Sequence, residues 1–250
     1  MSRLLVIALI ALFPVSFSFA EEAPAASAEI DHAPFHKLLK ANVKGTKVNY
    51  KGFKQSAEFK AYVALIGKTD PAKLSSRNAR LAFWINAYNA LTINGVLQYY
   101  PKIKSVLKVT PDFFKSKTRV VGGKKMALND IENNIVRPTF KDPRIHAALN
   151  CASVSCPPLA NFAFTPKGLN GQLNKVFRKF ANDTSRNQID PAAGTVKLSM
   201  IFKWYGDDFK KDGGPAKYIA KFVKDEGKKK ALTNTEKVDF LAYDWNLNKL

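Results

Sequence analysis

Hydrophobic positions recur at helical spacing along much of the chain. Together with capping residues they predict helices over residues 30–43, 56–67, 77–99, 129–137, 165–180 and 215–223. The longest of these has Ser75 or Ser76 available as an N-cap and ends before Pro101. Asn129 and Glu132 have the spacing of a capping box, which predicts the start of the 129–137 helix.

Shorter apolar runs predict strands between these helices. Residues 117–127 are typical of a hairpin that turns at Gly122 and Gly123. Further strands are predicted over residues 145–149, 196–200 and 238–243. A mixture of helices, strands and a hairpin favours the α+β class. We expect one compact domain that has a mixed sheet and a central long helix, with a papain-like or transglutaminase-like arrangement as one form of it.

The first residues have the pattern of a secretory signal. A basic start is followed by apolar residues 4–15, and Ser18-Phe19-Ala20 fits the small-x-small cleavage pattern. The apolar stretch is shorter than the roughly 20 residues that a membrane span requires. We therefore predict a signal peptide over residues 1–20, a flexible linker over 21–29 and a single domain over 30–250. The mature protein is expected to be periplasmic or secreted, with no membrane span after cleavage.

The chain is strongly basic, with a formal net charge of +20. Removal of residues 1–20 takes away one arginine and leaves +19. Lysines are spread along the whole sequence, which is typical of a solvated surface and also suits an anionic component of the cell envelope as a partner. No nucleic-acid-binding motif accompanies the charge, so we predict no nucleic-acid partner. We expect no cofactor, and the oligomeric state has no signal in the sequence.

Both cysteines and one of the three histidines fall within residues 144–158, where an apolar run ends in a loop of small residues. Cys151 and Cys156 can form a small disulfide, as is common in exported proteins. Cys151 can alternatively be a catalytic thiol, if a neighbouring group lowers its pKa. A metal pair is the third option, but the C-x4-C spacing is not diagnostic and no fourth ligand is evident, so we predict no metal. The fourth option is that both cysteines are inert thiols.

A catalytic Cys151 needs a base, and His146 is the obvious candidate. Asn86 or Asp244 would then orient the imidazole, and backbone amides near Ser153 would stabilise an oxyanion. If a strand ran straight from His146 to Cys151, the two residues would lie about 16 Å apart and on opposite faces. They can meet only if the chain turns between them. The other interpretation of His146 is a hydrogen-bonded histidine of the core.

The 77–99 helix carries amides among apolar neighbours. Asn86 and Asn89 should be hydrogen-bonded, because a buried amide without partners costs about 1–3 kcal/mol. Each can tie the helix to loop backbone, or one can orient a catalytic histidine. The candidate substrate-binding residues are Trp84, Tyr88, Asn89 and Ser153, although the two aromatic residues suit the core equally well.

Several motifs resemble the domain of unknown function 547 family, here as an exported bacterial member. They are Phe83-Trp-Ile-Asn-Ala-Tyr-Asn-Ala90, Ala148-Leu-Asn-Cys-Ala-Ser-Val-Ser-Cys-Pro157, Val48-Asn-Tyr50, Leu128-Asn-Asp-Ile-Glu132, Trp204-Tyr-Gly-Asp-Asp-Phe209 and Tyr243-Asp-Trp-Asn-Leu-Asn248. The resemblance covers roughly residues 35–250 and implies a fold but no reaction.

Two hypotheses for function follow from these patterns. The first is a Cys/His thiol hydrolase or acyltransferase that acts on envelope peptides or protein amides. The second is a non-catalytic basic binding module of the cell envelope, stapled by a Cys151–Cys156 disulfide.

Overall fold

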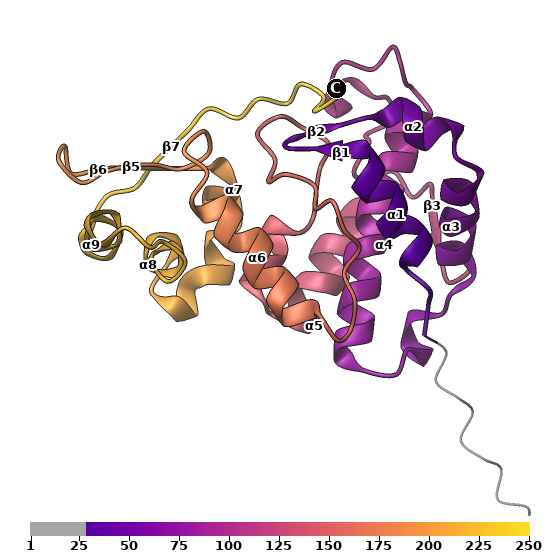
Figure 1. The fold of residues 1–250 in the computed structure, drawn as a ribbon, viewed down its shortest axis with the longest axis horizontal. Coiled ribbons are helices and arrows are strands. Elements are labelled where there is room, and N and C mark those ends of the chain that lie inside the picture. The colour runs from indigo at the N-terminus through magenta and orange to yellow at the C-terminus, as the bar shows by residue number, and fades with distance from the viewer. Residues whose placement is uncertain (1–28) are drawn as a thin grey trace, which may run out of the picture.

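The computed structural model describes residues 29–250 (Figure 1). The predicted signal peptide and all but the last residue of the predicted linker lie outside the described residues. The helices of the described part are α1 (Ala33–Asn42), α2 (Tyr50–Gln55), α3 (Ala57–Lys68), α4 (Arg77–Leu97), α5 (Arg137–Phe140), α6 (Leu169–Ala181), α7 (Met200–Trp204), α8 (Pro215–Ala220) and α9 (Glu226–Asn234). The strands are β1 (Val43–Lys44), β2 (Lys47–Val48), β3 (Arg119–Val121), β4 (Lys124–Met126), β5 (Gln188–Asp190), β6 (Thr195–Leu198) and β7 (Asp239–Phe240).

Helices dominate this single domain, and the strands form three small sheets. The pairs β1–β2 and β3–β4 are two-stranded, and β5–β6–β7 is mixed because β6 runs antiparallel to β5 and parallel to β7. The expected mixed sheet is therefore present, and it lies at one end of the molecule, beside α8 and α9 (Figure 1). The α+β expectation overestimated the strands, which are only two to four residues long.

The predicted long helix is confirmed as α4, the centre of the core. Ser76 caps it, because the Ser76 side chain accepts a hydrogen bond from the Ala79 amide at 3.0 Å. Sixteen of the 21 residues of α4 are buried, as is typical of a helix with neighbours on all sides. Gly95 allows close packing, since a Cβ there would lie 2.9 Å from the Phe113 ring. Buried polar side chains on α4 therefore face protein, not solvent.

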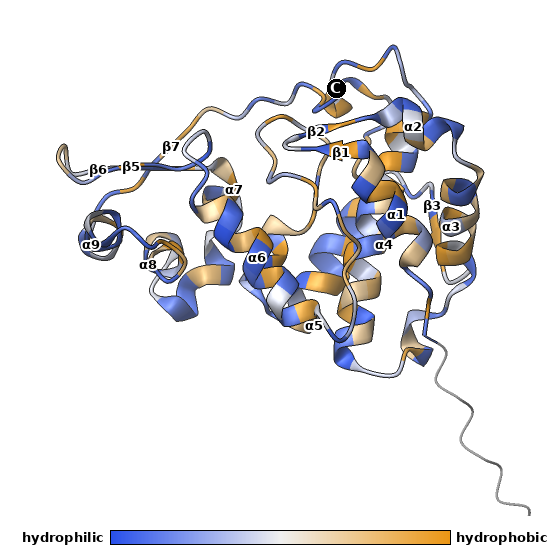
Figure 2. Ribbon diagram, viewed as in Figure 1, coloured by the Kyte–Doolittle hydropathy of each residue, from blue (hydrophilic) through white to orange (hydrophobic). Residues whose placement is uncertain are grey.

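The outer helices bury only one face. The buried residues of α6 lie at helical spacing, and polar residues cover its other side (Figure 2). α9 is mostly hydrophilic and buries only Leu232. α6 begins at Leu169, four residues later than predicted, because the Thr165 hydroxyl accepts from the Gly168 amide in a turn before the helix. Within residues 29–250, no helix has the length and hydrophobicity that a membrane span requires.

Residues 145–149 do not form the predicted strand. Residues Pro143–Ala147 form a 3-10 helix, whose first turn is capped by the Asp142 side chain through the Arg144 amide at 3.1 Å. An Asp-Pro pair is a helix-start signal, and here it decided the local structure over the apolar run that follows. The prediction of a strand that carries His146 towards Cys151 was therefore wrong.

The last residues of the chain pair with β2. After β7 the C-terminal segment crosses the molecule to reach β2 (Figure 1). There the Val48 amide donates to the Asn248 carbonyl at 2.9 Å, and the Leu250 amide donates to the Val48 carbonyl at 3.0 Å. The Asn248 side chain is buried and accepts from the Tyr50 hydroxyl at 2.6 Å. This path brings residues 243–248 against the cysteine loop.

Candidate functional site

The loop that carries Cys151 is built on amide side chains. Asn89, on α4, donates to the Ala148 carbonyl at 2.9 Å and accepts from the Asn150 amide at 2.8 Å. The Asn150 side chain then spans the loop, because it donates to the Pro157 carbonyl at 2.8 Å and accepts from the Ala152 amide at 3.0 Å. The loop is thus anchored to the central helix on one side and closed on itself on the other.

The residue after Cys151 has an unusual backbone. Ala152 is buried and has φ of +65°, a left-handed conformation that costs a non-glycine residue about 1–3 kcal/mol. Its carbonyl accepts from the Asn248 amide at 3.0 Å, so the C-terminal segment helps to hold this conformation. The sharp turn brings Ser153 back to Cys151, where the Ser153 backbone amide contributes to lowering the pKa of the thiol.

Arg186 holds the far side of the loop. Its guanidinium donates to the Val154 carbonyl at 2.6 Å and to the Cys156 carbonyl at 3.0 Å, and it forms an ion pair with Asp183 at 2.6 Å. Arg186 is itself buried. A buried charged group that is ion-paired and donates hydrogen bonds to two carbonyls of one loop fixes the geometry of that backbone.

Cys151 has the environment of a reactive thiol. Its sulfur lies 3.1 Å from the Ser153 hydroxyl and 3.3 Å from the Tyr243 hydroxyl. Burial raises the pKa of the Cys151 thiol, but hydrogen bonds from Cys156, Ser153 and Tyr243 outweigh burial and lower the pKa to about 7. Burial and the neighbouring Cys151 raise the pKa of Cys156 well above its usual range, so Cys156 remains a thiol.

The two cysteines are not bridged in this structure. Both are free thiols, and the Cys156 sulfur accepts from the Cys151 amide at 2.9 Å. The Cys156 sulfur also lies 3.8 Å from the Leu149 carbonyl oxygen. The predicted disulfide is therefore absent here, and Cys156 instead contributes to the hydrogen bonds around Cys151.

His146 belongs to a network with a carboxylate that the sequence did not single out. Its Nε2 lies 2.7 Å from Asp208, whose carboxylate also binds Arg137 through two bonds of 2.7 and 2.9 Å. Burial alone would raise the pKa of Asp208, but hydrogen bonds from His146 and Arg137 hold that pKa well below its usual range. The carboxylate can only accept, so the neutral imidazole carries its proton on Nε2 and a lone pair on Nδ1. This Nδ1 is buried and has no hydrogen-bond partner among the described residues.

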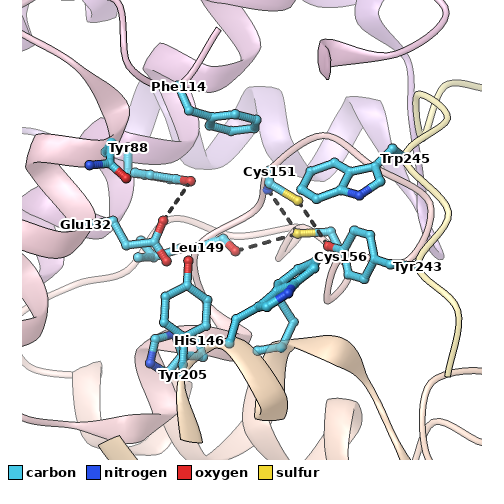
Figure 3. Close-up of a pocket in the computed structure, with 13 residues that line it drawn as sticks. Tyr88, Phe114, Glu132, His146, Leu149, Cys151, Cys156, Tyr205, Tyr243 and Trp245 are labelled. Atoms are coloured by element: carbon cyan, nitrogen blue, oxygen red, sulfur yellow. Dashed lines mark hydrogen bonds between the residues drawn. The ribbon is translucent and has the colours of Figure 1, made fainter. Parts of the chain in front are cut away.

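Cys151 and His146 line one pocket without contacting each other through a hydrogen bond. The pocket has a volume of about 250 Å³. In Figure 3, Cys151, Tyr243 and Trp245 lie on one side of it, and Tyr88 and Glu132 lie on the other. The Tyr205 ring stacks on the imidazole of His146, with ring centroids 4.2 Å apart. The direct Cys151–His146 dyad, one of the candidates considered from the sequence, is therefore not formed in this structure.

The predicted orienting residues are occupied elsewhere. Asn86 donates to the Phe164 carbonyl at 2.8 Å and accepts from the Phe164 amide at 2.9 Å, so it ties α4 to a loop. Asp244 is exposed and accepts from the Asn246 amide at 2.8 Å. Neither has a hydrogen bond with His146 in the described structure, and Asp208 occupies the orienter's position.

The predicted substrate-binding residues divide into two groups. Ser153 and Tyr88 are at the site, since Ser153 contacts the Cys151 sulfur and Tyr88 lines the pocket. Asn89 supports the cysteine loop, because its side chain is hydrogen-bonded to the loop backbone at Ala148 and Asn150. Trp84 is buried against Phe83 and lines a separate depression near β3 and β4.

Sequence reasoning missed most of the residues around the thiol. Those that line the pocket or orient His146 are Phe114, Glu132, Trp204, Tyr205, Asp208, Tyr243 and Trp245. Several lie in the family-like motifs at residues 128–132, 204–209 and 243–248. Those motifs marked the residues as important but did not indicate what each residue does. Glu132 was assigned to a capping box, yet Asn129 makes no side-chain cap, and Asp130 accepts from the Ala127 amide instead. Among residues 29–250 there is no cluster of three or more residues suited to hold a metal ion.

The fold and the site define a mostly helical domain with a preorganised thiol at the end of an aromatic pocket. Residues 71–181 match the model of the family described as "Protein of unknown function, DUF547", so the chain carries a domain of this family over those residues. The match covers Glu132, His146 and Cys151, whereas Asp208 and Tyr243 lie beyond it. No curated protein and no solved structure matches the chain, so no papain or transglutaminase likeness is found at the level of the fold.

Proposed function

We propose that this protein is an exported thiol-dependent hydrolase or acyltransferase with Cys151 as the nucleophile. The observation that carries the proposal is the half-buried Cys151 thiol, whose pKa is lowered to about 7 by surrounding hydrogen bonds and which faces a pocket. A cysteine with a lowered pKa is partly thiolate at neutral pH, and the thiolate is the attacking form. The rigid loop supports this role because an ordered nucleophile loses little entropy on reaching its target.

The chemistry is acyl transfer. The Cys151 thiolate forms a C–S bond with the carbonyl carbon of an amide, and the carbonyl electrons move to oxygen. The oxyanion collapses, the C–N bond breaks and the amine leaves with a proton. Water or a second amine then displaces the thiolate from the thioester. The Tyr243 hydroxyl is the proposed donor to the oxyanion, because the Ala152 amide is already bonded to Asn150.

His146 is the proposed group that gives a proton to the leaving amine. Asp208 fixes its tautomer, so the unpartnered Nδ1 first takes up the proton that the Cys151 thiol releases on forming the thiolate, and the resulting imidazolium then gives this proton to the leaving amine. In this role the imidazole donates to the leaving amine and not to the sulfur. A direct hydrogen bond between Cys151 and His146, which the structure lacks, is therefore not required. Asp208 is then a positioning residue, as the third member of a catalytic triad is.

The export pattern of residues 1–20 and the basic charge suggest a peptide or protein amide of the cell envelope as substrate. N-terminal sequencing of the mature protein should find a start at or near Glu21. An intact Met1 on a membrane-bound protein would contradict export.

Labelling with iodoacetamide across pH tests the nucleophile. We expect Cys151 to react along a titration curve centred near 7, below the roughly 8.5 of an ordinary cysteine, and Cys156 to stay unlabelled. Peptide mass spectrometry assigns the label, with Cys151→Ala and Cys156→Ala as matched variants. A Cys151–Cys156 disulfide in the native protein, or an ordinary thiol titration, would reject the enzyme and favour the basic binding module.

A further inference from the structure

The pocket has a second polar end, opposite the thiol, that the acyl-transfer proposal does not use. Glu132 lies there, half-buried, and accepts from the Tyr88 hydroxyl at 3.1 Å (Figure 3). Tyr205 points its hydroxyl towards the same carboxylate (Figure 3). Burial raises the pKa of both phenols, and the negative charge of Glu132 raises it further, so both remain neutral.

The charge of this end is unusual for the chain. The protein has 40 lysines and arginines, yet none of them lines the pocket. Among the described residues, Glu132 forms no ion pair. Arg137 is in the neighbourhood, but its guanidinium is bonded to Asp208 and Asn133. The charge of a partly buried carboxylate is usually balanced by a cationic side chain. For Glu132, that positive charge would have to come from a ligand in the pocket.

Aromatic rings form the walls between Glu132 and Cys151. Trp204 packs on Tyr243 and on Trp245, with ring centroids 4.8 and 5.7 Å apart, and Phe114 meets Trp245 at 6.3 Å. Trp204 is 43% exposed, so it stands at the opening. Aromatic faces attract cations and also cover the methylene groups of a long side chain.

We propose that the pocket binds a primary ammonium group, as at the end of a lysine-type side chain, with Glu132 as its counterion and the aromatic walls around its methylenes. The inference deepens the proposed function, because it names the substrate feature that would bring an amide to Cys151. A primary ammonium has three N–H donors, and the oxygens of Glu132, Tyr88 and Tyr205 supply acceptors. A guanidinium fits less well, since it prefers both oxygens of one carboxylate and Tyr88 already occupies one of them.

A fluorescence titration tests binding without using the thiol. Two of the three tryptophans, Trp204 and Trp245, line the pocket and report on its occupant. The probe is Nα-acetyl-lysine N-methylamide, and the matched ligand is the same compound acetylated on its side-chain nitrogen. We expect the charged probe to bind about tenfold more tightly, a ratio that corresponds to about 1.4 kcal/mol.

Variants then assign the counterion. Glu132→Gln should weaken the charged probe about tenfold and leave the acetylated ligand unchanged. Glu236→Gln makes the same charge change at an exposed site and should alter neither by more than about twofold. Tyr205→Phe should give a smaller weakening, and it keeps the ring that stacks on His146.

The outcomes separate this inference from the proposed function. Equal binding of the two ligands, no saturable signal, or an unchanged affinity in Glu132→Gln would overturn the ammonium site, whatever the reactivity of Cys151. Selective binding with an inert Cys151 would retain the ammonium site and reject the enzyme. A melting curve for each variant shows that the fold is intact.

Discussion

The sulfur of Cys151 lies 3.3 Å from the hydroxyl oxygen of Tyr243, 92 residues later in the chain. The contact exists because the C-terminal segment pairs with the cysteine loop, where the Val154 amide donates to the Asn246 carbonyl at 2.9 Å. Tyr243 is itself held as a neutral phenol, since burial and Cys151 raise its pKa well above the usual range. A neutral phenol at this place can donate to a thiolate, so Tyr243 links the end of the chain to the reactivity of the thiol.

Tyr243→Phe should therefore raise the pKa of Cys151. A hydrogen bond to a charged group contributes about 1.5 kcal/mol, which corresponds to about one pKa unit. The pH dependence of iodoacetamide labelling measures the change. Tyr99→Phe, at an exposed position, is the control and should leave the curve in place. An unmoved curve in Tyr243→Phe would show that Ser153 and Cys156 alone stabilise the thiolate.

Asn86→Leu should destabilise the protein although it adds apolar volume to the core. The substitution leaves the buried amide and carbonyl of Phe164 without their partners, and each stranded group costs about 1–3 kcal/mol. We expect a loss of about 2–5 kcal/mol in the free energy of unfolding, measured with urea. Asn78→Leu, in the exposed first turn of the same helix, should change stability by less than about 0.5 kcal/mol.

Arg186→Met should open the cysteine loop. The change removes the donors to the Val154 and Cys156 carbonyls and leaves Asp183 without its ion pair. Breaking a buried pair in this way costs about 3–5 kcal/mol. Cys156, which we expect to be protected in the native protein, should then become labelled by iodoacetamide at neutral pH. Arg178→Met is the matched control at an exposed position, and labelling of Cys156 in that variant would mean that loss of the Arg186 hydrogen bonds is not the cause.

His32 should make the protein less stable in mild acid. Burial lowers its pKa to about 4, against a smaller opposing effect of Asp31, and its ring is hydrogen-bonded to Tyr62 at 2.7 Å. The unfolded chain takes up a proton near 6.5 and the folded chain does not until about 4, so stability falls as the pH drops through this window.

The expected loss is about 2 kcal/mol between pH 7 and pH 4.5. Urea unfolding at both pH values should show this loss reduced in His32→Gln. His36→Gln, at an exposed position, should behave as the wild type. An equal pH dependence in all three proteins would show that His32 does not contribute.

The sequence predicted those parts of the fold that depend on near neighbours. Ser76, the pattern of α4 and the Gly122–Gly123 hairpin were interpreted correctly, because capping, helical spacing and tight turns act over a few residues. The burial of His32 is not visible in its local sequence, since it depends on a contact with Tyr62 in α3. The strand predicted at residues 145–149 failed for a local reason, the Asp142-Pro143 turn that precedes it.

For the site, the sequence alone determined where to look: the loop with both cysteines, and the buried amides of the long helix, of which Asn89 supports that loop. Only the tertiary structure decided which groups act on the thiol and on the imidazole. Tyr243 reaches Cys151 and Asp208 reaches His146 across 92 and 62 residues. Such pairs follow from how whole elements pack and from where the C-terminal segment returns, and no periodicity or spacing within one segment encodes them. The free energy that selects them is the burial of the entire core, so the chemistry of this pocket becomes visible only once the chain is folded.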